Sequence, residues 1–511
     1  MKIYSFSPFG YEGNLVSVEV DIRRGIPAID MVGLADGAVK ESRERMKSAI
    51  RNCGFEFPPE RVLISLSPAD LKKEGAGFDL PVALGVLAAA NASALLMDQS
   101  VLVMGELELS GALRPVRAVT AAAWTAVSNG IKYCVVPAAN AGEAMEAPGM
   151  KVFAANTLRE AYEALFDKSA FLSAAAKSDR DAPAGSEEVD GVFFPAAGEC
   201  ESFDDIRGQR ELVRACQVAA AGGHNLLVFG PPGCGKTLAL QRFPSLLPLL
   251  TVEEARSVAR IRSIAGLYAA GQGLCRTSPF RQPHQSASLE GMVGGGPNCR
   301  PGEISLAHNG VLFLDEAAEF KGSVLQMLRV PLESGFVTLS RAGRAAVYPA
   351  NFQLLMAVNP CPCGNYGSDK KICLCSMRSV ELYWRKFSAP LLDRVDLRVR
   401  VDIPDQEDGG PQVSTKDLRA KIARAVRIQR ERQGKKNSRL SPEEVKRFCA
   451  LDGEAERCLE DAVLRHDFSP RAAASCKKVA RTIADMDASE TILPAHIAEA
   501  VDLRKPEGVL P

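Results

Sequence analysis

The sequence has no excess of charge of either sign, because lysine plus arginine and aspartate plus glutamate both number 62 in 511 residues. A net charge of zero provides no overall attraction to nucleic acid, so any basic surface must be local. No apolar run approaches the ~20 residues that cross a bilayer. The first residues also lack the basic and apolar regions of a secretory signal. These absences predict a cytoplasmic protein without a membrane partner.

Cysteine is too sparse for a disulfide framework, with 14 residues spread over the whole chain. Most are expected to be small buried side chains. Hydrophobic residues make up 46% of the sequence, which is typical of a globular protein. The length predicts roughly two to four domains.

One stretch has the spacing of a phosphate-binding loop, with an apolar run before it and helix-forming residues after it. The loop reads Gly230, Pro231, Pro232, Gly233, Cys234, Gly235, Lys236 and Thr237. Its glycines allow backbone N–H groups to surround phosphates. Lys236 is expected to reach the β- and γ-phosphates, and the Thr237 hydroxyl to ligate Mg²⁺. ATP and Mg²⁺ are therefore the predicted cofactors, and a Gly/Pro-rich surface turn is the alternative.

Two later apolar runs end in polar residues. Residues 310–314 lead into Asp315 and Glu316, and residues 351–358 lead into Asn359. Apolar strands separated by helical stretches predict a parallel sheet whose ligand chemistry lies at the strand carboxyl ends. Asp315 is expected to hold Mg²⁺, and Glu316 to polarise the attacking water. Asn359 is expected to sense the γ-phosphate, with a simple Asn-Pro turn as the alternative.

Two arginines are candidates for completing a hydrolysis site. Arg394 follows the apolar run 389–392 and is a candidate arginine finger that reaches a neighbouring subunit's γ-phosphate. Arg471 begins a predicted helix and is a candidate second sensor within its own subunit. Arginines in such places are more often surface residues, so both assignments depend on the rest of the chain.

Residues 1–168 read as a mixed domain of strands and helices. Alternation over 15–22 predicts a strand, and 79–90 predicts a buried helix. The stretches that suggest a known fold are 71–81, 104–107 and 111–116. They resemble the protease domain of Lon-type proteases, which implies a serine near Gly77. Glycine offers no nucleophile, so the resemblance implies an inactive domain.

Composition divides the remaining chain into three segments. Residues 169–200 are small and charged without periodicity, which predicts an interdomain linker. Residues 201–402 carry the phosphate loop and the predicted parallel sheet. Residues 403–511 read as helical, with Ser441 as an N-cap before Pro442.

Four cysteines are clustered in an insertion at 361–375 within the middle segment. They are Cys361, Cys363, Cys373 and Cys375, in a C-x-C…C-x-C pattern. Four thiolates suit tetrahedral Zn²⁺, and the Gly/Asn/Ser-rich residues between the pairs allow them to face each other. A structural zinc is the favoured interpretation, and a reduced thiol loop or a redox pair are the alternatives.

Longer motifs identify a family. They are the stretches 279–284, 293–296, 301–316, 340–342 and 359–364. These resemble the YifB/ComM family of magnesium-chelatase-like AAA+ ATPases over nearly the whole chain. The resemblance implies an α/β protein with a Lon-protease-like α+β N-terminal domain, an AAA+ P-loop domain with a parallel sheet, and a helical chelatase-type C-terminal lid. It also implies a homohexamer with ATP between subunits, and it supports the roles given above to Glu316, Asn359, Arg394 and Arg471.

A hexamer would surround a channel lined by loops of each subunit. Residues 289–301 are one candidate loop, and the hairpin-like stretch 336–348 is another. Arg341 and Arg344 of the hairpin are expected to neutralise DNA phosphates independently of sequence. A basic helix between 415 and 439 is a second candidate surface. The alternative for both surfaces is a row of solvated arginines.

The favoured function is an ATP-hydrolysing motor on branched or single-stranded DNA, which the resemblance implies to be a helicase that drives branch migration in recombination of incoming DNA. The alternative is the motor subunit of a magnesium-chelatase-type or other protein-remodelling complex. The Lon-like domain favours the first, since chelatase motor subunits generally lack it. Glu316 argues against a third class, a non-hydrolysing switch, because a switch needs no water-activating carboxylate.

Overall fold

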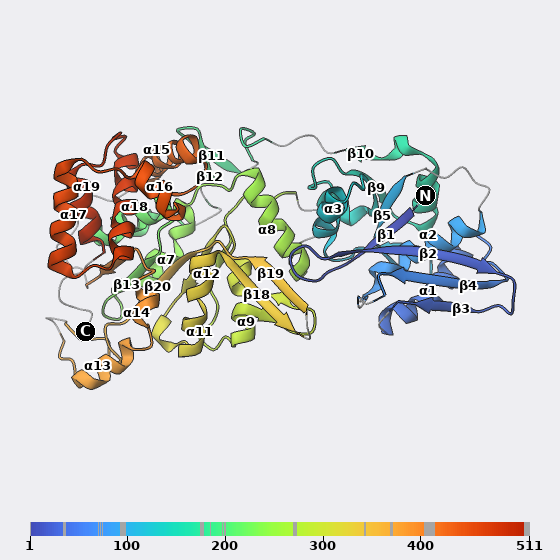
Figure 1. The fold of residues 1–511 in the computed structure, drawn as a ribbon, viewed down its shortest axis with the longest axis horizontal. Helices are drawn as coiled ribbons and strands as arrows, with labels where there is room; N and C mark the ends of the chain where they lie inside the picture. The colour runs from blue at the N-terminus through green and yellow to red at the C-terminus, as the bar shows by residue number, and fades with distance from the viewer. Residues whose placement is uncertain are drawn as a thin grey trace.

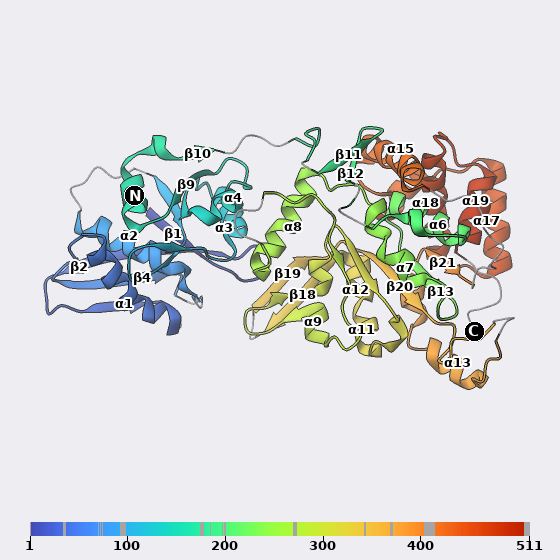
Figure 2. The ribbon, with the colours of Figure 1, turned by 180° about the vertical axis from the view of Figure 1, so that it is seen from behind.

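The three parts of the chain lie in a row in the computed structural model (Figure 1). An N-terminal sheet lies at one end, a parallel sheet in the middle and the C-terminal helices at the other end. Figure 2 shows the same order from behind, with helix α8 (Val252–Ala265) between the first two parts. The structure describes residues 2–33, 37–69, 71, 73, 75–91, 99–173, 178–183, 185–196, 198, 201–268, 273–341, 344–367, 371–402 and 414–504.

The N-terminal part is built on a mixed eight-stranded sheet. Its elements are β1 (Lys2–Ser7), β2 (Asn14–Arg23), β3 (Ile29–Val32), α1 (Gly37–Asn52), β4 (Arg61–Ser67), α2 (Asp79–Ala90), β5 (Ser100–Val103), β6 (Glu106–Leu107), β7 (Leu113–Arg114), α3 (Val119–Ser128), β8 (Tyr133–Pro137), α4 (Ala141–Ala144), β9 (Lys151–Ala155), α5 (Leu158–Glu163) and β10 (Leu172–Ser173). The strand order is β10-β9-β8-β5-β1-β2-β4-β3. The predicted strand and buried helix are confirmed as β2 and α2.

The turn before α2 carries no nucleophile at Gly77, where a Cβ would make only an ordinary contact of 3.9 Å with Val116. Asp79, the first residue of α2, is fully buried and accepts hydrogen bonds of 2.9 and 3.1 Å from the Arg45 guanidinium. The Leu107 N–H also donates to this carboxylate. Burial nevertheless raises the pKa of Asp79. The turn is therefore held by a buried ion pair under the helix.

The predicted linker 169–200 contains a folded hairpin, so it is not a linker throughout. β11 (Ser186–Val189) pairs with β12 (Val192–Pro195), and every residue of β12 is buried. Phe194 lies in a core shared by the parallel sheet and the C-terminal helices, with the Arg419 guanidinium 5.3 Å from its ring centroid. Composition obscured this strand because its short apolar run is embedded among small and charged residues.

The middle part holds the predicted parallel sheet, which is confirmed. Its strands are β13 (Leu226–Phe229), β14 (Phe280–Arg281), β17 (Val311–Leu314), β20 (Gln353–Val358) and β21 (Leu397–Arg400). They lie in the order β14-β17-β20-β13-β21, with parallel pairing throughout. The carboxyl ends of β17, β20 and β13 therefore meet at one edge of the sheet.

Both faces of this sheet are covered, as the alternation along β13 shows. Leu226 and Val228 face a core that includes residues of α6 (Arg210–Gly222), α15 (Thr415–Gln433) and α18 (Pro470–Met486). Leu227 and Phe229 face the opposite core. The elements around that second core and at the sheet edge are α7 (Lys236–Gln241), α9 (Leu289–Val293), β15 (Gly294–Gly295), β16 (Arg300–Pro301), α10 (Glu303–Leu306), α11 (Gly322–Met327), α12 (Arg329–Ser334), β18 (Phe336–Arg341), β19 (Arg344–Pro349), α13 (Met377–Trp384) and α14 (Ala389–Leu392).

The C-terminal part is helical, as predicted. Besides α15 and α18 it comprises α16 (Pro442–Phe448), α17 (Gly453–His466) and α19 (Pro494–Asp502). The N-cap at Ser441 is confirmed: its side chain accepts from the Glu444 N–H, and its own N–H donates to the Glu444 carboxylate at 2.7 Å. Among the described helices of the chain, none is long and apolar enough to cross a membrane.

Candidate nucleotide-hydrolysis site

The phosphate loop begins where β13 ends, at a position that only glycine fits. A Cβ on Gly230 would lie 1.9 Å from the Val401 carbonyl oxygen. Gly233 and Gly235 have φ angles of +84° and +86°, which favour glycine, and nothing lies within 4 Å of a Cβ at either. The loop is thus closed against β21 on one side and open on the other, before α7 begins at Lys236.

The Lys236 side chain turns back into this loop. Its ammonium group donates to the carbonyl oxygens of Gly230 and Pro231, both at 2.8 Å, and to Asn359 Oδ1 at 3.3 Å. Lys236 is buried, and burial lowers the pKa of its ammonium group. A cation is therefore held inside the loop by neutral acceptors, which an anionic ligand can replace with stronger charge-assisted bonds.

The two carboxylates after β17 differ in their surroundings. Thr237 Oγ1 donates to Asp315 Oδ1 at 3.0 Å, so the hydroxyl and the carboxylate predicted to ligate Mg²⁺ are in contact. The Glu316 N–H donates to the same oxygen at 3.0 Å. Glu316 itself is exposed, with a left-handed φ of +48° that is uncommon for a residue with a side chain. The structure thus brings together Lys236, Thr237, Asp315 and Asn359, and leaves the Glu316 carboxylate free to face solvent.

The structure groups Arg394 and Arg471 on a third residue, Glu333 of α12. One Glu333 oxygen accepts from the Arg394 guanidinium, and the other lies 3.3 Å from Arg471 Nη2. These cations, Arg394 first, lower the pKa of Glu333. Sequence reasoning assigned the arginines to different nucleotides, one in the neighbouring and one in the same subunit. Their shared carboxylate places them side by side, and no sequence pattern pointed to Glu333.

The four clustered cysteines converge on one point. All four sulfur atoms lie within 4.8 Å of one another. Three of the sulfur–sulfur distances are 3.4, 3.7 and 3.6 Å. These are too long for disulfides, whereas Zn–S bonds of about 2.3 Å place tetrahedral sulfurs roughly 3.8 Å apart. Backbone N–H donors lower the pKa of Cys363 to about 6, so one thiolate is already favoured. The cluster fits a zinc ion.

This insertion contacts the phosphate loop directly. A Cβ on Gly364 would lie 2.6 Å from Pro232 Cδ, so the two backbones approach closely. The Trp384 Nε1–H donates to the Pro360 carbonyl at 2.9 Å, which anchors the start of the insertion on α13. The cysteine insertion therefore follows directly after Asn359 and packs against the phosphate loop.

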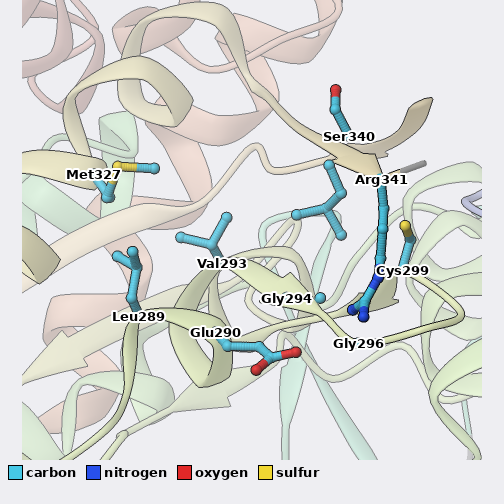
Figure 3. Close-up of a pocket in the computed structure, with 11 residues that line it drawn as sticks. Leu289, Glu290, Val293, Gly294, Gly296, Cys299, Met327, Ser340 and Arg341 are labelled. Atoms are coloured by element: carbon cyan, nitrogen blue, oxygen red, sulfur yellow. The ribbon is translucent and has the colours of Figure 1, made fainter. Parts of the chain in front are cut away.

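The two arginines of the β18–β19 hairpin have different surroundings. Arg341 is exposed and lines a hollow of about 280 Å³. Figure 3 shows its side chain extending along this hollow towards the turn at Gly296, on the same side as Glu290. Arg344 instead lies over the Phe9 ring of the N-terminal part, 3.8 Å from the ring centroid.

The second candidate surface for DNA is largely committed to internal contacts, contrary to that expectation. Arg427 pairs with Asp190, Arg432 with Asp485 and Lys435 with Glu444. Arg424, Arg430 and Arg439 donate to the backbone carbonyls of Met486, Leu249 and Phe352. The cations of α15 and the following turn therefore stabilise the packing of the C-terminal helices.

Three family descriptions match consecutive parts of the chain. "Subunit ChlI of Mg-chelatase" matches residues 18–140. "Magnesium chelatase, subunit ChlI" matches residues 202–408, and its C-terminal counterpart matches residues 412–504. These matches cover the N-terminal part from within β2 to β8, the nucleotide site and the C-terminal helices.

Curated relatives with the printed names YifB and ComM match over nearly their whole length. "Uncharacterized protein YifB" of Escherichia coli is 39% identical over 99% of this chain and 97% of that protein. "Competence protein ComM" of Haemophilus influenzae is 38% identical over 98% of this chain and 97% of that protein. "Lon protease 2" of Bacillus subtilis is 30% identical over 149 residues, which are 28% of this chain and 27% of that protein.

The chain belongs to the YifB/ComM family of magnesium-chelatase-like AAA+ proteins. Its architecture is that expected from the resemblance, with a Lon-protease-like α+β sheet, a P-loop parallel sheet and a helical C-terminal part.

Proposed function

We propose that this protein is an ATP-hydrolysing AAA+ motor that acts on DNA as a homohexamer, in recombination of incoming DNA. This proposal rests mainly on the contacts of Lys236 with Asn359 and of Thr237 with Asp315, at the ends of three neighbouring strands. The relative with the printed name "Competence protein ComM" supports DNA uptake and recombination as the setting. We also propose that the present chain is divided into units at 1–168, 201–402 and 403–511, and that the hairpin of residues 186–195 belongs to the second unit.

The residues at the site fit a magnesium-bound nucleoside triphosphate. The loop is open around Gly233 and Gly235 and contains a buried ammonium group whose present partners are neutral. Lys236 would hold the β- and γ-phosphates, while Thr237 and Asp315 would hold Mg²⁺. The nucleotide would supply the phosphoanhydride bond that is cleaved, and Mg²⁺ would neutralise the negative charge of its phosphates.

The chain's own side chains then activate water and read the nucleotide state. The exposed Glu316 carboxylate orients a water molecule and takes its proton. Asn359 shares its amide oxygen with Lys236 in this structure, so nucleotide binding and the Asn359 side chain are coupled through one ammonium group.

Arg394 and Arg471 together would contact the nucleotide of the neighbouring subunit. Two guanidiniums that meet at one carboxylate lie side by side, and this favours one shared target over two. The γ-phosphate would replace Glu333 as their partner. This replaces the earlier expectation that Arg471 acts within its own subunit.

DNA binding is proposed for the channel-facing hairpin, with Arg341 as the exposed cation. The plot of log affinity against log salt concentration has a negative slope, and loss of one phosphate contact makes that slope shallower by about 1. Arg341→Ala is therefore expected to weaken binding similarly for different DNA sequences and to reduce the salt dependence. Fluorescence anisotropy over a range of salt concentrations measures both. An unchanged salt slope would contradict a phosphate contact at Arg341.

The second candidate is a motor that remodels a protein partner, as a magnesium-chelatase subunit does. It is favoured by the chelatase descriptions that match all three parts of the chain. It predicts ATP hydrolysis that DNA does not change.

The deciding experiment measures ATP hydrolysis with and without four-way-junction DNA. We expect DNA to stimulate hydrolysis in the wild type, and Glu316→Gln to lower the rate by roughly 10²–10⁴-fold, as for other general bases. Unchanged hydrolysis in Glu316→Gln would contradict the assigned site. Absence of both DNA binding and stimulation would contradict the DNA motor and leave the remodelling motor.

A further inference from the structure

The turn between β1 and β2, residues 8–13, reaches out of the N-terminal sheet into the middle part of the protein. Phe9 and Tyr11 pack against the core that lies on one face of the parallel sheet. Gly10, between them, is buried with a left-handed φ of +66°, and a Cβ there would lie 3.1 Å from the Ala346 Cβ of β19. The close approach to Ala346 and the left-handed backbone both favour glycine at this position.

Phe9 holds the hairpin that carries the candidate DNA contacts. The Arg344 guanidinium lies over its ring at 3.8 Å, a cation–π contact that favours one position of the hairpin. Arg344 lies directly opposite Arg341 in the β18–β19 register. The turn therefore fixes one side of the hairpin, while Arg341 on the other strand stays exposed.

Tyr11 begins a hydrogen-bond chain that enters the ATPase core. Its hydroxyl lies 2.9 Å from Ser257 Oγ of α8, and that oxygen lies 3.0 Å from His308 Nε2. His308 Nδ1 accepts from the Asn351 N–H at 3.1 Å. Because Nδ1 is an acceptor, the neutral ring carries its proton on Nε2 and donates to Ser257.

This chain of hydrogen bonds ends next to the first residues of β17 and β20, the strands that lead to the candidate catalytic residues. The Asn309 N–H donates to the Asn351 carbonyl at 2.8 Å, so the segments before β17 and β20 are tied together at this point. β17 leads to Asp315 and Glu316, and β20 leads to Asn359. The same Asn351 follows the β18–β19 hairpin, so hairpin, strands and N-terminal turn share one junction.

We propose that the N-terminal turn couples the β18–β19 hairpin to the starts of the strands that carry the catalytic residues, and that this coupling acts on DNA-stimulated rather than basal ATP hydrolysis. Phe9 holds the hairpin in one position. Tyr11 holds the starts of β17 and β20 in position through its hydrogen bond to Ser257 and that of Ser257 to His308. DNA that loads the hairpin then changes hydrolysis at the far ends of the strands. The DNA part of this inference rests on the proposed function, whereas the positioning part does not.

The test uses the full-length variant Phe9→Ala/Tyr11→Phe, with Phe166→Ala as the control. Phe166 is also a partly exposed phenylalanine of the N-terminal part, and it stacks on Tyr162, away from the turn. Hydrogen exchange at the Asn309 and Asn351 amides is measured without nucleotide or DNA. We expect exchange two- to tenfold faster in the double variant and unchanged in the control, because one network link and one aromatic contact are lost.

The second measurement is the steady-state ATPase rate with and without four-way-junction DNA. We expect the DNA-stimulated kcat to fall roughly three- to tenfold in the double variant. The KM for ATP and the basal kcat should remain within about twofold, since no residue at the nucleotide is altered. A purely structural role would lower basal and stimulated rates alike.

Each result decides a separate part of the inference. Unchanged exchange at Asn309 and Asn351 overturns the positioning role. Faster exchange with an unchanged ratio of stimulated to basal rate overturns the coupling. If DNA fails to stimulate the wild type, the proposed DNA motor fails instead, and faster exchange in the double variant still supports positioning of the strands.

Discussion

At the scale of single residues, Lys236 links the phosphate loop to Asn359 at the end of β20. Its ammonium group donates to neutral oxygens of Gly230, Pro231 and Asn359, so its removal leaves no unpaired charge behind. Lys236→Ala should therefore weaken ATP binding roughly ten- to hundredfold, because charge-assisted hydrogen bonds contribute about 1.5–3 kcal/mol. Isothermal titration calorimetry measures the affinity.

The control for that substitution is Lys321→Ala, which removes an exposed lysine at the start of α11. Circular dichroism melting should show both variants folded. Equal ATP affinity in wild type and Lys236→Ala would contradict the assigned role.

His308 gives the protein a dependence on pH that is separate from the nucleotide. Burial, with the nearby Arg439 charge, lowers the pKa of His308 from its ordinary 6.5 to about 4. Between these values the unfolded chain binds more protons than the folded chain, so the free energy of unfolding falls as the pH falls. The full loss is about 3 kcal/mol.

Comparison with His308→Gln isolates this contribution from that of the carboxylates. Urea unfolding between pH 7 and pH 4 should give a shallower decline in the variant than in the wild type. Equal declines in the free energy of unfolding would show that folding does not lower the pKa of His308.

Site residues next to a strand could be predicted from sequence, because a strand fixes where its last residue lies. The phosphate loop, Asp315 and Asn359 follow apolar runs, and the parallel sheet brings them together. Glu333 could not be predicted in this way, since its position beside Arg394 and Arg471 is set by the packing of α12 on a distant part of the chain.

At the scale of elements, short apolar strands and charged helices were the hardest to interpret. β12 is only four residues long, and Phe194 is buried by partners more than 200 residues later, such as Arg419. The basic residues of α15 looked like a nucleic-acid surface because sequence shows a charge but not its partner. The start of α16 could be predicted because the N-cap at Ser441 is a local signal.

The cysteine insertion is an element whose zinc content can be measured. Purified protein should contain about one zinc per chain, held by four thiolates. Cys363→Ser and Cys373→Ser should each reduce this below half an equivalent, and should weaken ATP binding because the insertion packs on Pro232 of the phosphate loop. Metal analysis by mass spectrometry measures the zinc.

Cys275→Ser is the matched control, since Cys275 is exposed and lies outside the cluster. It should retain zinc and ATP affinity. Wild-type protein with free thiols and less than half an equivalent of zinc would contradict the zinc assignment.

At the scale of the whole molecule, the two sheets are joined through one helix and one turn. α8 is held by the N-terminal turn at Ser257 and, one turn and a half further on, by Glu143 at Ser263. The overall architecture was predictable from motifs, but this joint was not. It depends on residues such as Gly10 and Tyr11, whose partners are distant in sequence.

The central claim is that each hydrolysis site is shared between two subunits, with Glu316 from one and Arg394 from the next. It is tested most directly by mixing Glu316→Gln and Arg394→Ala proteins, each inactive alone. In a mixed ring, a subunit that keeps Glu316 can lie beside one that keeps Arg394, so about one quarter of the sites are complete when equal amounts mix at random. The mixture should recover ATP hydrolysis well above the sum of the separate variants. A mixture with no recovery under conditions in which the subunits exchange, or an Arg394→Ala protein that is fully active alone, would contradict it.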